Sequence, residues 1–184
     1  LPATYTENEE EATSLDITLH DSVMDTDLVL TYSVYEDYPV VTRSARLVQK
    51  GNQKIRLENV MSAAVEFPDM DYEMIHLSGA WARERYVKTR KLEMGIQAVQ
   101  SLAGTGSSSE QNPFIALKRP HTTEDTGEVF GFSFVYSGNF LAQVEVSTYE
   151  MTRVMMGINP QGFSWELSRD EEFQTPEVVM VYSD

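Results

Sequence analysis

The sequence contains no cysteine among its 184 residues. This excludes disulfides, thiolate nucleophiles and cysteine-ligated metal sites. A chain without disulfides suits a reducing compartment, so we expect a cytoplasmic protein. The sequence also lacks any apolar run of the roughly 20 residues that a membrane-spanning helix needs. We therefore expect no membrane span and no membrane partner, and the first five residues show neither the basic start nor the apolar stretch of a signal peptide.

Basic residues are scarce as well. The chain has 14 Lys and Arg against 29 Asp and Glu, which gives a net charge of −15. Binding to nucleic acid requires clustered cations that neutralise phosphates, so a nucleic-acid partner is excluded. Histidine is limited to His20, His76 and His121, and this spacing matches no metal motif. We interpret the three as structural residues and expect no metal or organic cofactor.

Helical periodicity is almost absent. Apolar residues instead alternate with polar ones, as in residues 15–19, 28–34, 130–136 and 140–146, and this period of two is typical of β-strands. Residues 178–182 form a nearly continuous apolar run, as in a buried strand. About ten or more short strands separated by turns predict an all-β fold, an antiparallel β-sandwich with little helix.

The remaining segments are interpreted as turns and loops, with one exception. Residues 50–53 predict a hairpin turn into a strand that starts at Ile55, and the small polar residues 104–110 predict a loop. The acidic run 7–11 is interpreted as a solvated surface. Only residues 90–102 show a weak helical pattern.

The segment 79–85, Gly-Ala-Trp-Ala-Arg-Glu-Arg, is the most informative motif. Trp81, Arg83 and Arg85 are two residues apart, so on an extended strand they would share one face. An indole beside two guanidinium groups suits a planar or hydroxyl-rich ligand, and it also suits a packed interface. Interface packing is the favoured interpretation, because buried Arg side chains would need acidic partners across a contact.

Catalytic motifs are not evident. Nucleophile-elbow and phosphate-loop spacings are absent. Glycoside hydrolysis needs two carboxyl groups roughly 5 to 9 Å apart across the scissile bond, and the sequence alone does not place such a pair. The clusters 69–71 and 124–125 are interpreted as turn residues. The alternating aromatic residues, which we assign to core packing, are Phe130, Phe132, Phe134, Phe163 and Trp165.

Several short segments follow one another along the chain in an order that is typical of one family. They are residues 1–5, 42–44, 79–85, 112–114, 123–125, 127–129, 136–140, 157–160, 162–165, 173–177 and 182–184. In this ordered set the chain resembles the N-terminal β-sandwich domain of family 36 glycoside hydrolases, the bacterial and fungal α-galactosidases. The fold implied by the resemblance is a supersandwich of the galactose-mutarotase type.

The resemblance implies that the catalytic residues lie elsewhere. Enzymes of this family have an N-terminal sandwich, a catalytic (β/α)₈ barrel and a small C-terminal β domain. Their Lys-Trp-Asp nucleophile motif and their glycine-rich acid/base motif lie on the barrel, and neither motif occurs here. A barrel alone needs about 250 residues. We therefore expect residues 1–184 to be most of a single N-terminal domain with no catalytic residue, and family members carry further β-rich sequence before the match at residues 1–5.

The resemblance also implies a function for the parent protein. That protein would hydrolyse terminal α-D-galactosyl residues of melibiose- and raffinose-type sugars with retention, without a cofactor. The implied partners are the catalytic barrel of the same polypeptide, further copies in a homo-oligomer (a tetramer in the family), and galactosides at the parent's active site. Trp81, Arg83 and Arg85 are the candidates for a substrate rim or an interface. One departure is Glu110, which stands near the place where the family usually has a loop histidine.

Two other functions stay open at this point. An independent carbohydrate-binding module would bind galactosides through Trp81 by itself. A structural adaptor sandwich would have no link to sugars, and its flanking sequence would lack a barrel.

Overall fold

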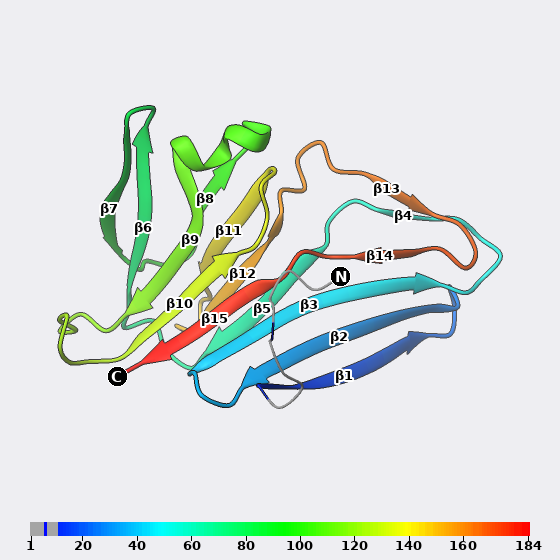
Figure 1. Cartoon of the computed structure of the whole chain (residues 1–184), viewed down its shortest axis with the longest axis horizontal. Helices are drawn as coiled ribbons and strands as arrows, with labels where there is room; N and C mark the ends of the chain where they lie inside the picture. Colours follow the sequence, from blue (N-terminus) through cyan, green and yellow to red (C-terminus); the bar gives the residue numbers. More distant parts are fainter. Residues whose placement is uncertain (1–5, 7–10) are drawn as a thin grey trace.

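The computed structural model of the chain describes Thr6 and residues 11–184 (Figure 1). The family-like segment 1–5 and most of the acidic run 7–11 lie outside the described residues. The described part contains fifteen strands and one short 3₁₀ helix, and every strand pair is antiparallel. The predicted all-β antiparallel class is confirmed. The described residues form no helix that is long and apolar enough to cross a membrane.

Nine strands form one large sheet. Its order is β1-β2-β3-β15-β10-β9-β6-β7, and β14 pairs with β3 off this path. The strands are β1 (Ala12–Asp21), β2 (Thr26–Tyr35), β3 (Val40–Gln49), β6 (Glu73–Ala80), β7 (Arg83–Lys91), β9 (Gln111–Lys118), β10 (Val129–Phe134), β14 (Glu172–Gln174) and β15 (Val178–Ser183).

A smaller sheet packs on part of the large one. It has four strands in the order β5-β12-β11-β8. Its strands are β5 (Met61–Phe67), β8 (Gly95–Ser101), β11 (Phe140–Val146) and β12 (Thr152–Ile158). A separate two-stranded pair, β4 (Ile55–Leu57) with β13 (Trp165–Leu167), and the 3₁₀ helix η1 (Gly104–Ser109) complete the described fold.

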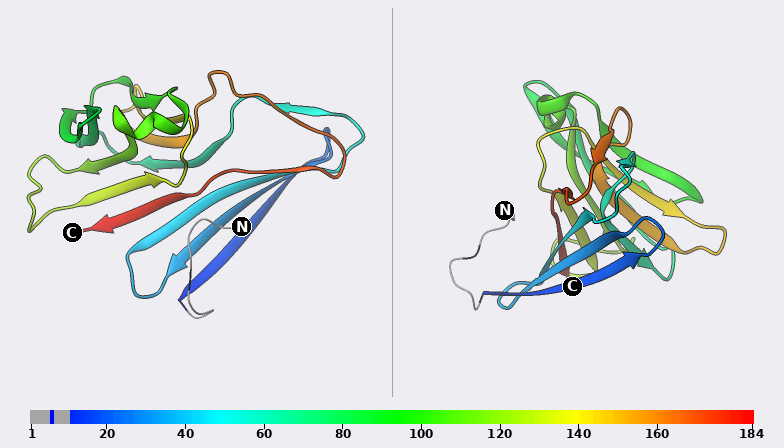
Figure 2. Two further views of the ribbon diagram at one scale, coloured as in Figure 1. Left: turned by 45° about the horizontal axis from the view of Figure 1, so that its top comes forward. Right: turned by 90° about the vertical axis from the view of Figure 1, so that its right-hand side faces the viewer.

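The core lies between the two sheets. Phe132 and Phe134 of β10 contribute their side chains from the large sheet, and Phe140, Val144 and Val154 contribute theirs from the small sheet. All five are at most 2% exposed. Figure 2 shows that the small sheet covers only one part of the large sheet, while β1, β2 and β3 extend beyond it. The domain is therefore a sandwich with one covered half and one open half.

Three local predictions were wrong. Residues 90–102 are not helical, because they lie in β7, which pairs with β6, and in β8, which pairs with β11. Strand pairing thus overrides a weak local preference. Residues 50–53 do not close a hairpin, since β4 pairs with β13 rather than with β3. Residues 104–109, expected as a plain loop, form η1.

The aromatic residues assigned to the core fall into two groups. Phe132 and Phe134 are buried in the main core, and Phe130 packs against it. Trp165 is 51% exposed and contacts Phe173 on β14, so its assignment to the core was wrong. It belongs to a small outer cluster because β13 lies in the separate two-stranded pair.

Candidate functional site

The candidate site lies on the hairpin that joins β6 to β7. Ser78 pairs with Tyr86, and after a register shift Ala80 pairs with Arg83, so the chain reverses within two residues. Gly79 makes this close reversal possible. A Cβ atom on Gly79 would lie 2.3 Å from the carbonyl oxygen of Arg83, which no side chain tolerates without movement of the backbone. The hairpin is consequently tight and bulged at its tip.

The structure corrects the expected arrangement of the three site residues. Trp81 and Ala82 form the turn itself, and Ala82 has a positive φ of 63°. Arg83 and Arg85 follow on β7, but Arg85 also has a φ of 63°, which interrupts the alternation of faces. The prediction of one shared strand face was therefore wrong. The hairpin nevertheless brings the three residues to one tip.

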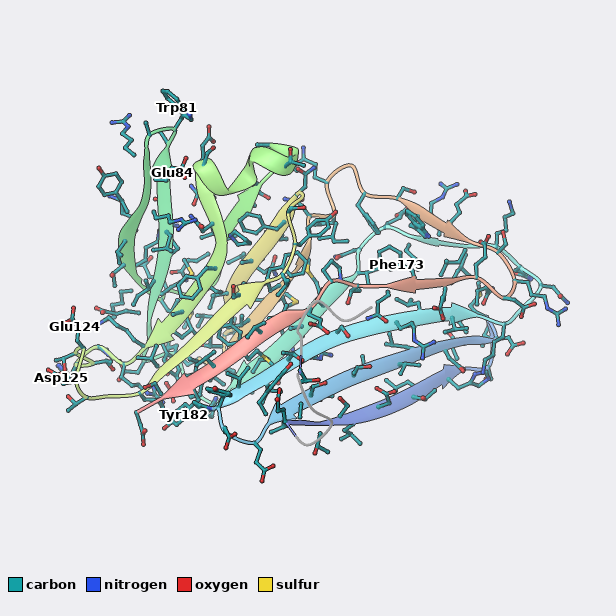
Figure 3. All side chains as sticks on the ribbon, viewed as in Figure 1. Trp81, Glu84, Glu124, Asp125, Phe173 and Tyr182 are labelled. Carbon is teal, nitrogen blue, oxygen red and sulfur yellow. The ribbon has the colours of Figure 1, made fainter. Side chains whose placement is uncertain are left out.

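Trp81 is presented to the outside. Its side chain projects from the end of the hairpin, away from the two sheets (Figure 3), and it is 85% exposed. Arg83 and Arg85 are exposed too, and within the part of the chain that the structure describes neither forms an ion pair. Trp and Arg are enriched among the residues that contribute most of the binding energy in protein interfaces. An exposed indole beside two unpaired guanidinium groups is therefore suited to such an interface.

A polar depression lies beside the tip. Its volume is about 320 Å³, and its lining residues are Ser78, Gly79, Ala80, Arg83, Tyr86, Lys88 and Gln111. No carboxylate lines it. The buried Oε1 atom of Gln111 lacks a hydrogen-bond donor among the described residues.

Positive charge is concentrated on the outer strand of this hairpin. Within its nine residues β7 carries five of the fourteen basic residues of the chain, namely Arg83, Arg85, Lys88, Arg90 and Lys91. β7 is also an end strand of the large sheet. In a chain of net charge −15, this edge is suited to an acidic or hydroxyl-rich surface.

His76 lies on the same hairpin but in the interior. It is 2% exposed, faces Lys88 across β6 and β7, and finds no hydrogen-bond partner for either ring nitrogen among the described residues. Burial lowers its pKa below the ordinary value of 6.5, and the charges of Arg90 and Lys88 lower the pKa further. His76 is therefore a neutral core residue. In the described ranges no three His, Asp or Glu residues are grouped so that they could hold a metal ion.

Glu66 of β5 and Glu145 of β11 are the direct neighbours of Arg153 on the small sheet. Arg153 of β12 pairs with Glu66 on one side and with Glu145 on the other. Its guanidinium donates to Glu66 Oε1 over 2.9 Å from Nε. A glycosidase needs a free carboxyl group on each side of the sugar bond. Here Arg153 stands between the two residues in the strand register and its guanidinium is hydrogen-bonded to Glu66, so Glu66 is engaged in an ion pair.

The two acidic clusters, predicted as turn residues, lie in the connections between β5 and β6 and between β9 and β10. Asp69 accepts a hydrogen bond of 2.7 Å from Arg119, which also donates to Glu128 over 2.8 Å and lies 3.9 Å from the ring centroid of Tyr72. The Arg119 guanidinium holds the pKa of Asp69 below its ordinary range. Glu124 and Asp125 lie in the turn that joins β9 to β10 (Figure 3).

The fold and the candidate site together indicate the class of protein, a non-catalytic β-sandwich domain with an exposed contact site. The described residues form an antiparallel β-sandwich with an apolar interior, and the candidate residues Trp81, Arg83 and Arg85 lie exposed at the tip of one hairpin.

Comparison with known proteins then identifies the family. The model of the glycosyl hydrolase family 36 N-terminal domain matches residues 1–168, and the chain belongs to this family. It is 54% identical over 184 residues to alpha-galactosidase AgaA of Geobacillus stearothermophilus and 43% identical over 184 residues to alpha-galactosidase 1 of Pediococcus pentosaceus. Each match covers 100% of this chain and 25% of the relative, so the chain spans about a quarter of the length of these relatives.

The solved structures agree. The crystal structure of the GH36 alpha-galactosidase AgaA from Geobacillus stearothermophilus superposes with a TM-score of 0.97 at 53% identity, over 100% of this chain and 26% of that chain. The alpha-galactosidase from Lactobacillus brevis gives a TM-score of 0.96 at 38% identity, over 100% of this chain and 25% of that chain. The resemblance to family 36 is thus confirmed.

Proposed function

We propose that this chain is the N-terminal domain of a longer α-galactosidase that hydrolyses terminal α-D-galactosyl residues of melibiose- and raffinose-type sugars with retention. The observation that carries the proposal is the family match over residues 1–168, together with relatives named α-galactosidases that are four times as long. The ion pairs that engage Asp69 and Glu66 support it, because they leave these carboxylates unsuited to bond cleavage. The two catalytic carboxylates belong to the barrel in the remainder of the polypeptide.

The role of the domain is to support the barrel and to border a neighbouring subunit in a cytoplasmic homo-oligomer, a tetramer, near the galactoside site of the parent. Trp81, Arg83 and Arg85 make this contact. A side chain as large as Trp81 buries about 150–250 Å² on contact. At about 25 cal/mol per Å² this corresponds to roughly 4–6 kcal/mol of transfer free energy before the entropy of association is subtracted. The charge of β7 selects an acidic or hydroxyl-rich counterpart.

The contact is tested with the Trp81→Ala variant of the longer polypeptide. We expect weaker assembly by analytical ultracentrifugation and a raised KM for raffinose, while the unfolding midpoint of the isolated chain does not change. Tyr149→Ala is the matched control, because Tyr149 is equally exposed (86%) but lies in the turn between β11 and β12. If the two substitutions have equal effects on assembly and KM, Trp81 does not lie in the interface.

An independent carbohydrate-binding module is the second candidate, since Trp81 and the polar depression lie on the same hairpin. Titration calorimetry of the isolated chain with galactose and melibiose separates the two. The proposed function predicts no binding at millimolar concentration. Saturable binding that is abolished by Trp81→Ala would favour the module instead.

A further inference from the structure

The tip of the β6–β7 hairpin receives little support from the sheet that carries it. β7 is an end strand of the large sheet, and its residues are exposed along its whole length. On the other side of β6, strand β9 begins only at Gln111, which pairs with Ser78. Residues 79–83 therefore extend past the first paired residue of β9. A two-stranded hairpin without further neighbours is only marginally stable in water, so the position of this tip needs another support.

The 3₁₀ helix η1 leads to a backbone contact with the tip. The amide of Gly79 donates a hydrogen bond to the carbonyl oxygen of Glu110 over 2.9 Å. Glu110 directly follows η1, which lies beside β6, β8 and β9 at the same end of the domain as the tip (Figure 1). Because this acceptor is a backbone atom next to η1, the position of the tip depends on the position of η1.

The start of η1 is fixed by a side chain from a distant part of the chain. The amide of Gly104, the first residue of η1, donates a hydrogen bond to the Oδ1 atom of Asn139 over 2.7 Å. Asn139 lies 35 residues further along, in the connection between β10 and β11. The first amides of a helix have no acceptor within the helix, so this oxygen takes the place of a local N-terminal cap.

Asn139 is itself held by Asn159, which is 2% exposed. The amide of Asn159 donates to the carbonyl oxygen of Asn139 over 3.0 Å. The Nδ2 atom of Asn159 donates to the carbonyl oxygen of Phe140 over 3.2 Å and to Oε1 of Gln100 over 3.0 Å. Its Oδ1 atom accepts from the amide of Gln161 over 3.0 Å. A buried network with satisfied polar groups is rigid, because each broken bond would leave an unpaired group in the interior.

We propose that Asn139 is a positioning residue for the contact at the hairpin tip. Its side chain fixes the start of η1, and the carbonyl of Glu110 at the other end of η1 fixes Gly79, two residues before Trp81. Loss of the Asn139 acceptor releases η1, and with it the tip, without removing an apolar side chain from the core. The inference rests on the proposed function, which assigns the subunit contact to this tip.

Hydrogen exchange of the unsubstituted longer polypeptide tests the link between η1 and the tip. If η1 holds the tip, the amides of Gly79 and Gly104 open in one cooperative unit. We therefore expect the two exchange rates to rise in parallel as denaturant is added. A Gly79 amide that opens independently of the Gly104 amide overturns the inference. This measurement does not depend on the folding of a substituted protein.

Substitution of Asn139 in the longer polypeptide tests the same link. In Asn139→Ala the amides of Gly79 and Gly104 should exchange about tenfold faster, because one hydrogen bond that holds η1 is lost. Asn139→Asp keeps an oxygen acceptor and should exchange as the parent does. Asn52→Ala is the matched control, since Asn52 Oδ1 also accepts one side-chain hydrogen bond, from Arg169, but lies between β3 and β4 at the other end of the domain (Figure 1). An unchanged Gly79 rate in Asn139→Ala contradicts the inference.

A double-mutant cycle in the longer polypeptide tests whether Asn139 acts through the tip. Asn139→Ala should raise KM for raffinose and leave kcat unchanged, while Asn139→Asp should keep the KM of the parent. In the Trp81→Ala background, Asn139→Ala should have no further effect on KM, because the contact is already lost. An equal increase of KM in both backgrounds overturns the role of Asn139. If Trp81→Ala alone changes neither assembly nor KM, the contact in the proposed function fails, whereas coupled exchange of Gly79 and Gly104 still supports the fixing of the tip by η1.

Discussion

The covered and open halves of the large sheet are built from the same sequence pattern and differ only in what lies over them. Phe132 of β10, in the covered half, is 2% exposed, while Ile17 of β1, in the open half, is 41% exposed. Both occur in alternating segments that predict a strand. Alternation therefore indicates which face of a strand is apolar, but it does not indicate whether another part of the chain covers that face.

The largest expected change in stability follows from removing an aromatic ring from the core of the covered half. Phe140→Ala removes a fully buried side chain between the sheets and should lower the free energy of unfolding by about 3–5 kcal/mol. Leu15→Ala in the open half should change it far less, because Leu15 is already 59% exposed in the isolated chain. Urea unfolding of both variants checks this. Similar losses would mean that the open half is covered in the isolated chain.

A backbone contact at the tip of the hairpin between β6 and β7 gives the next effect. Gly79→Ala should destabilise the chain by about 1–3 kcal/mol, because the new methyl group would collide with the carbonyl oxygen of Arg83. Gly131→Ala on β10 is the matched control, since its Cβ would meet its nearest neighbours at 3.9 Å. Thermal unfolding compares the two. If Gly79→Ala is tolerated as well as Gly131→Ala, the hairpin tip is looser than described.

Ion pairs in the two halves are also expected to differ in their contribution to stability. Arg119→Met in the covered half removes hydrogen bonds to Asp69 and Glu128 and the contact with the Tyr72 ring, and should destabilise by about 1–2 kcal/mol after solvent screening. Arg46→Met in the open half breaks one exposed pair with Glu172 and should have a smaller effect in the isolated chain. Chemical denaturation at low and high salt measures the loss of unfolding free energy in each variant. Equal losses in the two variants would contradict the expected difference between the two ion pairs.

The smallest effect is a pH dependence. Burial lowers the pKa of folded His76 below 6.5, so below pH 6.5 the unfolded chain takes up a proton that the folded chain does not. Stability should therefore fall as the pH decreases below 6.5, by at most about 1.4 kcal/mol per pH unit from this residue. His76→Leu should make that slope shallower, whereas His121→Gln, at an exposed position, should not. An unchanged slope in the His76 variant would show that this histidine does not titrate as described.

The sequence predicted the elements better than their assembly. Alternation identified β1, β2, β10 and β11 because each strand carries its own pattern. It did not identify the partner of β4, since β4 and β13 are about a hundred residues apart and pair through contacts that no local pattern encodes. β8 was missed as a strand because its pairing with β11, and not its own propensity, determines its conformation.

The role of Trp81, Arg83 and Arg85 as a site stays a prediction, and their geometry was not predicted correctly. Trp81, Arg83 and Arg85 do lie together, yet the turn at Trp81-Ala82 lacks the Gly or Asn that usually indicates a hairpin turn. Gly79 was the available signal, because a glycine two residues before the turn permits the close approach of Arg83. The position of the basic strand β7 at an end of the large sheet could not be predicted before the sheet order was known.

Hydrolysis of a chromogenic α-galactoside, measured for the isolated 184-residue chain and for the longer polypeptide, tests whether residues 1–184 contain catalytic carboxylates. We expect turnover by the longer polypeptide and none by the isolated chain, because the proposed function assigns the two catalytic carboxylates to the barrel. Turnover by the isolated chain that is lost on substitution of Glu66 or Glu145 would contradict it.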